Sequence, residues 1–401
     1  MSKTHLWQEE MTEAEGSITI SITIENHQKT RTRLWYRLPY ECRELVTNSC
    51  DPFVVATILM AMNQSTDLIV HGEVSPSLLQ NLTEFQAAWN SWLPNNYSLI
   101  NIIADVEKEQ INNQSSDQVI AAFSGGVDSC FTMFRHRTGS CGRWQRNLTA
   151  GLMVHGFDIP LSQKEIFDST AQRSKIMLSS LGVELIPLAT NFRQVIKVKW
   201  TDTFATALGS CVRLLQRGFQ ASLIPSSFPY NALSFPYGSN PVTDNLLSSN
   251  TFKIIHDGAA FSRLDKIREI VNWPEALEHI RVCWQGSQKD RNCCCCEKCV
   301  RTILNFRILG IDLPPCFEQD VTDNQILRLQ VEAGGQLDAL ERTLKAAKKA
   351  GISKSWVNAT EICIKRSQIE NTLKNNLSPT LKKRLVQLRT LISKKEFIDI
   401  R

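Results

Sequence analysis

Residues 118–129 read Gln-Val-Ile-Ala-Ala-Phe-Ser-Gly-Gly-Val-Asp-Ser, and this stretch decides the fold of the 401-residue chain. The apolar run from Val119 to Phe123 has the length and the β-branched content of a buried strand. Residues 130–137, which follow the stretch, favour a helix. Two adjacent glycines between a strand and a helix let the backbone approach a ligand closely, with amide groups pointing at it. The stretch therefore predicts a phosphate-binding loop.

The strand-then-helix pattern repeats along the chain beyond this loop. Further strands are predicted at residues 148–154, 183–188 and 221–224, and helices at 163–181 and 201–217. Strands that alternate with helices at this spacing predict an α/β fold, with a parallel sheet covered by helices on both faces. Ligands of such open sheets bind at the carboxyl ends of the strands, where the loop lies.

Polar side chains in the loop suit a nucleotide that carries magnesium. The hydroxyls of Ser124 and Ser129 can donate to phosphate oxygens, and Asp128 can bind Mg²⁺ on a pyrophosphate group. No lysine follows the glycines, so this is not the Walker loop that supports γ-phosphate transfer. The predicted leaving group is pyrophosphate. The alternative is an ordinary Gly-Gly turn with a serine cap.

The motif Ser-Gly-Gly-Val-Asp-Ser resembles the phosphate loop of the PP-loop ATP pyrophosphatase superfamily, and the resemblance covers residue 118 to about residue 310. It implies a HUP/PP-loop type of fold and an enzyme that adenylates a substrate, releases pyrophosphate and then loses AMP to a second nucleophile. The end of the second strand usually cradles the adenine through backbone groups, a role that falls here to Val154. The implied ATP-binding positions are Ser124, Gly125, Gly126, Val127, Asp128, Ser129 and Val154.

Further candidates lie beyond the motif. His155 and Asp158 follow Val154 and are either functional or structural, His155 pairing with a backbone group and Asp158 capping a turn. Arg263 and Lys266 start a helix one turn apart and could neutralise the triphosphate or an acidic substrate, unless they are solvated charges. We predict a catalytic set of four residues, Asp128, Ser129, Lys266 and Arg263. The Gly- and Pro-rich loop over residues 224–244 is where a substrate should lie.

The chain contains 13 cysteines, five of which lie between residues 293 and 299. Cys283, Cys293, Cys296 and Cys299 have the C-x9-C-x2-C-x2-C spacing that suits a structural zinc site with four thiolate ligands. This array resembles the zinc-binding element of the 7-cyano-7-deazaguanine synthase branch of the superfamily. Cys294 and Cys295 depart from that pattern, so a shifted ligand pair or a redox-sensitive role stays open.

The length favours more than one packed unit, and we predict three. Residues 1–115 form an α+β unit, with a strand of alternating isoleucines at 18, 20, 22 and 24 and helices over 51–62 and 77–92, the second capped by Ser77. Residues 116–312 form the PP-loop domain, including the zinc element 283–299. The C-terminal region 313–401 is helical and basic, and the polar run 112–117 marks the first boundary.

Charge and hydropathy bound the partners and the compartment. Of the net charge of +5, residues 341–401 contribute 15 Lys and Arg against 5 Asp and Glu, or +10, so the rest of the chain is at −5. The tail, with Lys382-Lys383-Arg384 and Lys394-Lys395, could contact nucleic acid or an acidic protein, or form a solvated face. With no membrane-length apolar run and no signal peptide, we expect a cytoplasmic protein, with oligomerisation open.

The function expected from the resemblance is an adenylating ligase or synthase that uses ATP, Mg²⁺ and Zn²⁺. A small-molecule or protein carboxylate attacks the α-phosphate, and an amine or ammonia then displaces AMP to give an amide or a nitrile. One alternative is thiolation or another modification of a tRNA base, which needs a sulfur-relay cysteine. Cys130 is expected to point into its helix instead. The other alternative is an ATP-binding subunit without catalysis.

Overall fold

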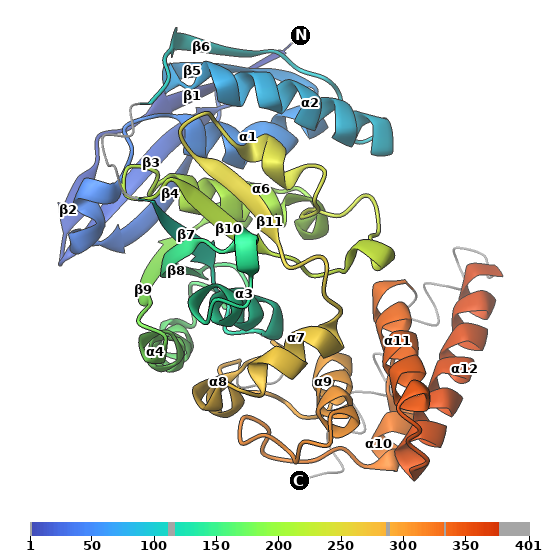
Figure 1. The fold of residues 1–401 in the computed structure, drawn as a ribbon. Coiled ribbons are helices and arrows are strands. Elements are labelled where there is room, and N and C mark those ends of the chain that lie inside the picture. The colour runs from blue at the N-terminus through green and yellow to red at the C-terminus, as the bar shows by residue number, and fades with distance from the viewer. Residues whose placement is uncertain (1, 111–116, 286–288, 333, 377–401) are drawn as a thin grey trace. The chain divides into compact units, whose positions relative to one another are not determined.

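The computed structural model describes residues 2–110, 117–285, 289–332 and 334–376 (Figure 1). Among these residues, 11 strands form one mixed sheet in the order β11-β10-β7-β8-β9-β4-β3-β1-β5-β6, with β2 pairing to β3 outside this path. Of the helices described, none is both long and apolar enough to cross a membrane.

The second half of the sheet is parallel throughout and carries the phosphate loop. It consists of β7 (Gln118–Ala122), β8 (Asn147–His155), β9 (Glu184–Thr190), β10 (Ala221–Pro225) and β11 (Lys253–Asp257). The bounds of β7 to β10 confirm the four predicted strands to within two residues, whereas β11 is not among the predicted strands. The strands of this half lie in the order β9-β8-β7-β10-β11. Starting from β7, the chain adds β8 and β9 on one side and then β10 and β11 on the other side. The carboxyl ends of β7 and β10 therefore flank a topological switch point, where ligands of α/β sheets bind.

Helices cover both faces of this half. A Cβ atom built on Gly151 would lie 2.8 Å from side chains of both α3 and α4, so that position faces these two helices. The next residue, Leu152, joins the core cluster that contains Ala207 and Cys211 of α6, on the other face. The helices of this part are α3 (Val127–Arg137), η2 (Gly142–Trp144), α4 (Lys164–Ser180), α5 (Phe192–Val195), α6 (Trp200–Arg213), η3 (Tyr230–Ala232), η4 (Asp244–Leu247), α7 (Arg263–Ile270) and α8 (Pro274–His279).

The first half of the sheet is mixed. Its strands are β1 (Ser2–Gln8), β2 (Thr12–Ala14), β3 (Ser17–Glu25), β4 (Arg31–Pro39), β5 (Thr66–Val74) and β6 (Ile102–Glu107), with η1 (Tyr40–Leu45), α1 (Asp51–Gln64) and α2 (Pro76–Trp92). The four alternating isoleucines of β3 are all buried, as their period of two predicts. The predicted cap Ser77 is wrong, because α2 begins at Pro76 and Ser75 takes the cap position. Proline suits the first helical position, where its missing N–H costs no hydrogen bond.

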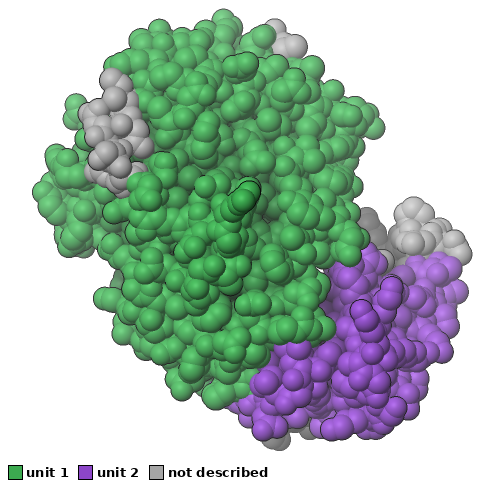
Figure 2. Space-filling model, in the orientation of Figure 1, with its two compact units in different colours: residues 1–292, 314–316 green, residues 293–313, 317–401 purple. Residues whose placement is uncertain are grey.

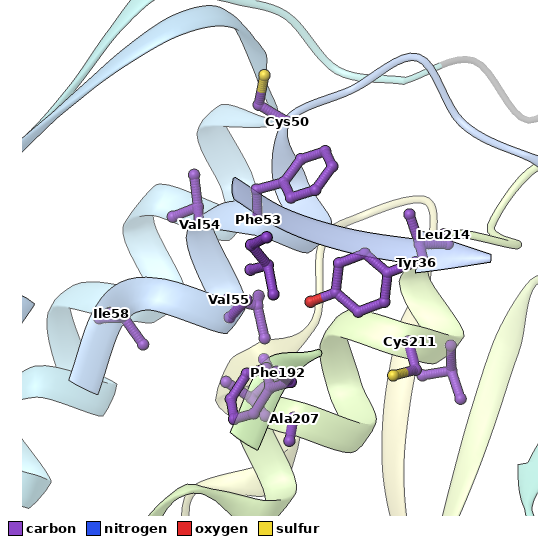
Figure 3. Close-up of a cluster of buried hydrophobic side chains, with 14 of the residues drawn as sticks. Tyr36, Cys50, Phe53, Val54, Val55, Ile58, Phe192, Ala207, Cys211 and Leu214 are labelled. Carbon is purple, nitrogen blue, oxygen red and sulfur yellow. The ribbon is translucent and has the colours of Figure 1, made fainter. Parts of the chain in front are cut away.

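The two halves share one sheet and one core. Strand β4 pairs antiparallel with β9 through Tyr36↔Thr190 and Arg37↔Ala189. Figure 3 shows Tyr36 and Phe53 of the first half in the same buried cluster as Phe192 and Cys211 of the second. Within the folded chain, the residues before and after position 115 are therefore parts of one packed body.

By packing, the chain divides into two compact units (Figure 2). The first comprises residues 1–292 and 314–316, and the second comprises residues 293–313 and 317–401. The described part of the second unit is helical, with α9 (Glu297–Ile308), α10 (Asp323–Arg328), α11 (Gly335–Lys349) and α12 (Ser355–Asn376). The domain limits at 115/116 and 312/313 stay predictions, because compactness does not say which parts fold independently. Most of the predicted boundary segment, 112–116, and the basic tail clusters lie outside the described residues.

Candidate functional site

The phosphate loop connects β7 to α3, and hydrogen bonds between its own residues hold its conformation. Gly125 has φ +72°, a left-handed conformation that favours glycine, and Gly126 is the N-cap of α3. The Ser129 hydroxyl donates to the Gly126 carbonyl at 3.0 Å and lies 3.4 Å from the Ser124 hydroxyl. The two serines predicted to bind phosphate thus lie together at the N-terminus of an 11-residue helix. This end of a helix attracts anions.

Asp128, in the first turn of α3, meets the two cations predicted from a distant segment. Lys266 Nζ lies 2.8 Å from Asp128 Oδ1, and an Arg263 guanidinium nitrogen lies 3.3 Å from Asp128 Oδ2. Lys266 also donates to the carbonyl of Ser226, directly after β10. The structure therefore brings together Asp128, Ser129, Arg263 and Lys266, on both sides of the switch point.

Burial distinguishes these charges from solvated surface groups. Lys266 is 1% exposed, and the side chains of Arg263 and Asp128 are 20% and 25% exposed. Helix α7 is fixed in place by a capping box, in which the Ser262 hydroxyl and the Asp265 carboxylate bond each other's backbone N–H groups. Lys266, Arg263 and Asp128 together carry a charge of two minus one, or +1, which favours an anion at this helix N-terminus.

The end of β8 is held by its own side chains. Val154 is partly buried, packs against the main core and pairs with Leu188 of β9. His155 donates from Nε2 to the carbonyl of Pro160 at 2.9 Å and stacks on Phe167, and burial lowers the pKa of His155. These contacts give His155 a structural role, one of the two alternatives considered for it. At Gly156, φ is +104° and a Cβ would lie 2.1 Å from the Thr190 carbonyl oxygen, so the turn requires glycine.

The loop after β10 begins at the same edge of the sheet, and hydrogen bonds to the side chain of Asp244 hold its conformation. The buried carboxylate of Asp244 accepts from the Ser239 hydroxyl at 2.6 Å and from Nδ1 of His256 at 2.8 Å. Tyr237 lies two residues before Ser239. Burial raises the pKa of Tyr237, and the negative charge of Asp128 raises this pKa further. The Tyr237 ring packs edge-on against Phe204 and Phe228.

The structure adds a cation that the sequence analysis missed. The backbone N–H of Arg281 donates to the Gly125 carbonyl at 2.9 Å, which places this residue against the phosphate loop. Arg281 is 8% exposed, and burial lowers the pKa of its guanidinium. Its Nε has no hydrogen-bond partner among the described atoms. Nothing in the sequence around Arg281 marks it, because it follows no strand and belongs to no recognised motif.

The middle and the last turn of α3 are anchored to the end of β11 by Asp257. This fully buried carboxylate accepts from the Thr132 hydroxyl at 2.7 Å, from the indole N–H of Trp144 at 3.2 Å and from His136 at 3.3 Å. The anchor fixes the helix whose N-terminus forms the loop. The sequence segment His256-Asp257-Gly258 gave no sign of this role, since the partners lie more than 110 residues away.

The four predicted zinc ligands lie together. The thiol sulfurs of Cys283, Cys293, Cys296 and Cys299 are all within 4.8 Å of one another. Cys293 Sγ and Cys299 Sγ are 3.9 Å apart, close to the roughly 3.8 Å edge of a tetrahedron with 2.3 Å zinc–sulfur bonds. The backbone N–H of Cys296 donates to Cys293 Sγ at 3.3 Å, a contact that stabilises a thiolate. Cys294 and Cys295 stay outside the group, so the donor set fits zinc without a shifted pair.

Cys130, the thiol nearest to the phosphate loop, is fully buried, and burial raises its pKa well above the usual value.

Compared with family models, with curated proteins and with solved structures, the chain gives no match. Its functional interpretation therefore depends on the residues and their geometry.

Proposed function

We propose that this chain is an AMP-forming ATP pyrophosphatase of the PP-loop type, which adenylates a carboxylate and passes the acyl group to a nitrogen nucleophile. The observation that carries the proposal is the meeting of Asp128 with Lys266 and Arg263 at the switch point of a 3-2-1-4-5 parallel sheet. Arg263 and Lys266 lie 135 and 138 residues after Asp128 in the sequence, and the three side chains meet at one helix N-terminus. An incidental Gly-Gly turn would not require that convergence.

In the proposed reaction, a carboxylate oxygen attacks the α-phosphorus of ATP, and the bond to the bridging oxygen of pyrophosphate breaks. The amides of the loop, with Ser124 and Ser129, would hold the phosphates, while Lys266 and Arg263 would offset the charge that develops on pyrophosphate. A nitrogen nucleophile then attacks the acyl carbon, and AMP leaves with the former carboxylate oxygen. The backbone N–H of Arg281 holds the Gly125 carbonyl, and its guanidinium donates to the carbonyls of Cys283 and Lys289, so this residue would support the loop.

Two metals belong to the proposal. Asp128 would hold Mg²⁺, which neutralises charge on the pyrophosphate group when bound, provided that Lys266 or Arg263 turns from this carboxylate to the phosphates. The cluster of Cys283, Cys293, Cys296 and Cys299 would hold Zn²⁺, and four thiolates leave no open position for chemistry. We therefore assign zinc a structural role next to α9.

The alternatives receive less support. Thiolation of a tRNA base needs a reactive thiolate near the loop, and burial keeps Cys130 protonated and inaccessible. A non-catalytic ATP-binding subunit does not need a partly exposed aspartate that is paired with two cations. The strand order and the loop position together support the proposed HUP/PP-loop fold type.

An ATP–pyrophosphate exchange assay tests the adenylation step. The full chain is incubated with ATP, Mg²⁺ and labelled pyrophosphate, together with fractionated small-molecule carboxylates or proteins. We expect label to enter ATP with one class of fraction and to fall at least 100-fold in Asp128→Asn. Asp168→Asn, which removes an exposed carboxylate on α4, is the matched control and should not change the rate. Exchange that is equal in both variants, or absent with every fraction, contradicts the proposal.

A further inference from the structure

The outer face of the first half of the sheet carries aligned aromatic and basic side chains. Register places His71, Trp7, Thr23 and Arg33 in one row across β5, β1, β3 and β4, so their side chains share a face. Positions two residues along each strand extend the same face, which also presents His5, Glu25, Arg31, Trp35 and Arg37. The strands lie next to one another at the N-terminal end of the sheet (Figure 1).

Stacked rings form the centre of this face. His5 Nδ1 and His71 Nε2 are 3.0 Å apart and their rings are nearly coplanar, at 3°. The Trp7 indole stacks on His71 with ring centroids 3.5 Å apart and is still 40% exposed. A hollow of about 290 Å³ lined by Trp7, Thr23 and Arg31 opens beside the indole. This volume is near the lower end of the roughly 300–1,000 Å³ of small-molecule pockets.

Cations lie on the β4 side of the rings. Along β1, β3 and β4 the outward positions carry four cations against one carboxylate, Glu25: Lys3, Arg31, Arg33 and Arg37. Arg31 pairs with Glu25 and Arg33 with Glu9, and their side chains remain 69% and 49% exposed. The Arg37 guanidinium lies 5.3 Å from the Trp35 ring centroid, a cation–π contact. Toward β5 and β6 the charges balance, since Asp67 lies opposite Lys3 and Asp105 lies 3.3 Å from His71, so the basic track follows β4, which carries three arginines and no carboxylate.

We propose that this face binds single-stranded nucleic acid, with bases stacking on Trp7 and on the guanidinium planes and with phosphates on the arginines. Exposed aromatic side chains on a sheet, beside a basic track, are the general means of holding unstacked bases without base pairing. A duplex hides the faces of its bases, so the aromatic stack favours single strands over double strands. The proposal does not depend on the adenylation chemistry, because every residue in it belongs to β1, β3, β4 and β5 or the residues next to them.

The test uses the full chain without ATP and labelled oligonucleotides of about 12 nucleotides, a length in the range covered by single-strand binding sites. Fluorescence anisotropy compares single-stranded RNA, single-stranded DNA and the matching duplexes. We expect Trp7→Ala to weaken single-strand binding roughly 5- to 150-fold, the loss typical of one stacked base, and Trp7→Phe to restore most of it. Arg37→Ala should lower the salt slope by about 0.7, the value for one phosphate contact.

Arg143→Ala, an exposed arginine in η2 away from this face, is the matched control and should leave binding unchanged. Poly-glutamate serves as competitor. The proposal is overturned if no single strand binds, if duplexes bind more tightly, or if Trp7→Ala and Arg143→Ala behave alike. It is also overturned if poly-glutamate displaces the oligonucleotide equally well, because the face then recognises acidic protein.

Discussion

Lys266 joins the two sides of the candidate site, because its ammonium group contacts both Asp128 and the Ser226 carbonyl. Replacing it by Met keeps the length of the side chain but leaves Asp128 without its closest cation. We expect Lys266→Met to lower the rate of pyrophosphate release by about 100- to 1,000-fold, the loss typical for one preorganised charge. Arg268→Met, on the same helix but exposed and paired with Asp265, should stay within two-fold of the wild type. Equal rates for both variants would show that Lys266 is only structural.

Gly156 illustrates how one residue shapes the end of β8. It shares a positive φ with Gly16, but a Cβ at Gly156 would meet the Thr190 carbonyl at 2.1 Å, whereas nothing lies within 4 Å of a Cβ at Gly16. Gly16→Ala should therefore cost only backbone strain, roughly 1–2 kcal/mol. Gly156→Ala should cost more than this in the free energy of unfolding, measured by urea denaturation. A smaller loss at position 156 than at position 16 would contradict the described turn.

Helix α9 begins at the cysteine cluster, and the metal prediction concerns this element. Metal analysis of the full chain, purified without chelator, should find one zinc ion per molecule. Cys296→Ser removes a ligand and should lose the zinc and destabilise the chain. Cys295→Ser changes an exposed neighbour outside the cluster and should keep it. Zinc-free wild-type protein, or zinc loss in Cys295→Ser alone, would refute the assignment of ligands.

The anchor between α3 and β11 should depend on pH. Burial alone lowers the pKa of His136, but hydrogen bonds with Asp257 and Cys141 raise it above its ordinary value of 6.5. The native state thus holds this proton more tightly than the unfolded state does. Its contribution to stability is complete below pH 6.5 and is lost as the pH rises through the native pKa.

Denaturation of wild type and His136→Gln at about pH 6 and pH 8.5 measures this effect. The stability difference between the two proteins should shrink as the pH rises. A difference that stays constant or grows would mean that His136 is neutral in the native state.

Most of the parallel half of the sheet could be predicted, because the signals in it are local. The apolar strands, the Gly-Gly loop and the cysteine spacing each lie within a short stretch, and Asp128, Arg263 and Lys266 follow from their positions at strand and helix ends. Arg281 could not be predicted, since only the folded chain brings it to Gly125. The pairing of β4 with β9 was also hidden, because it joins strands about 150 residues apart through two residue pairs.

A buried ion pair joins the two halves of the first unit. Arg213 of α6 donates to Asp51 of α1 at 2.8 Å, and both side chains are fully buried. Asp51 also accepts from the hydroxyl and the backbone N–H of Ser75. Asp51→Ala leaves the arginine charge without a partner and should cost about 3–5 kcal/mol of unfolding free energy.

Asp168→Ala, which breaks an exposed pair on α4, should cost less than about 1 kcal/mol. Urea denaturation followed by circular dichroism compares the two variants. Similar losses would mean that the first 110 residues and the parallel half are not energetically coupled through this pair.

We propose that the loop after β7 directs cleavage of ATP between the α- and β-phosphates. The most direct measurement is a product analysis with ATP labelled separately at the α- and γ-phosphates, in the presence of Mg²⁺ and the acceptor fraction that supports exchange. We predict AMP and pyrophosphate in equal amounts, and neither product from Asp128→Asn. Formation of ADP and inorganic phosphate instead would contradict the account.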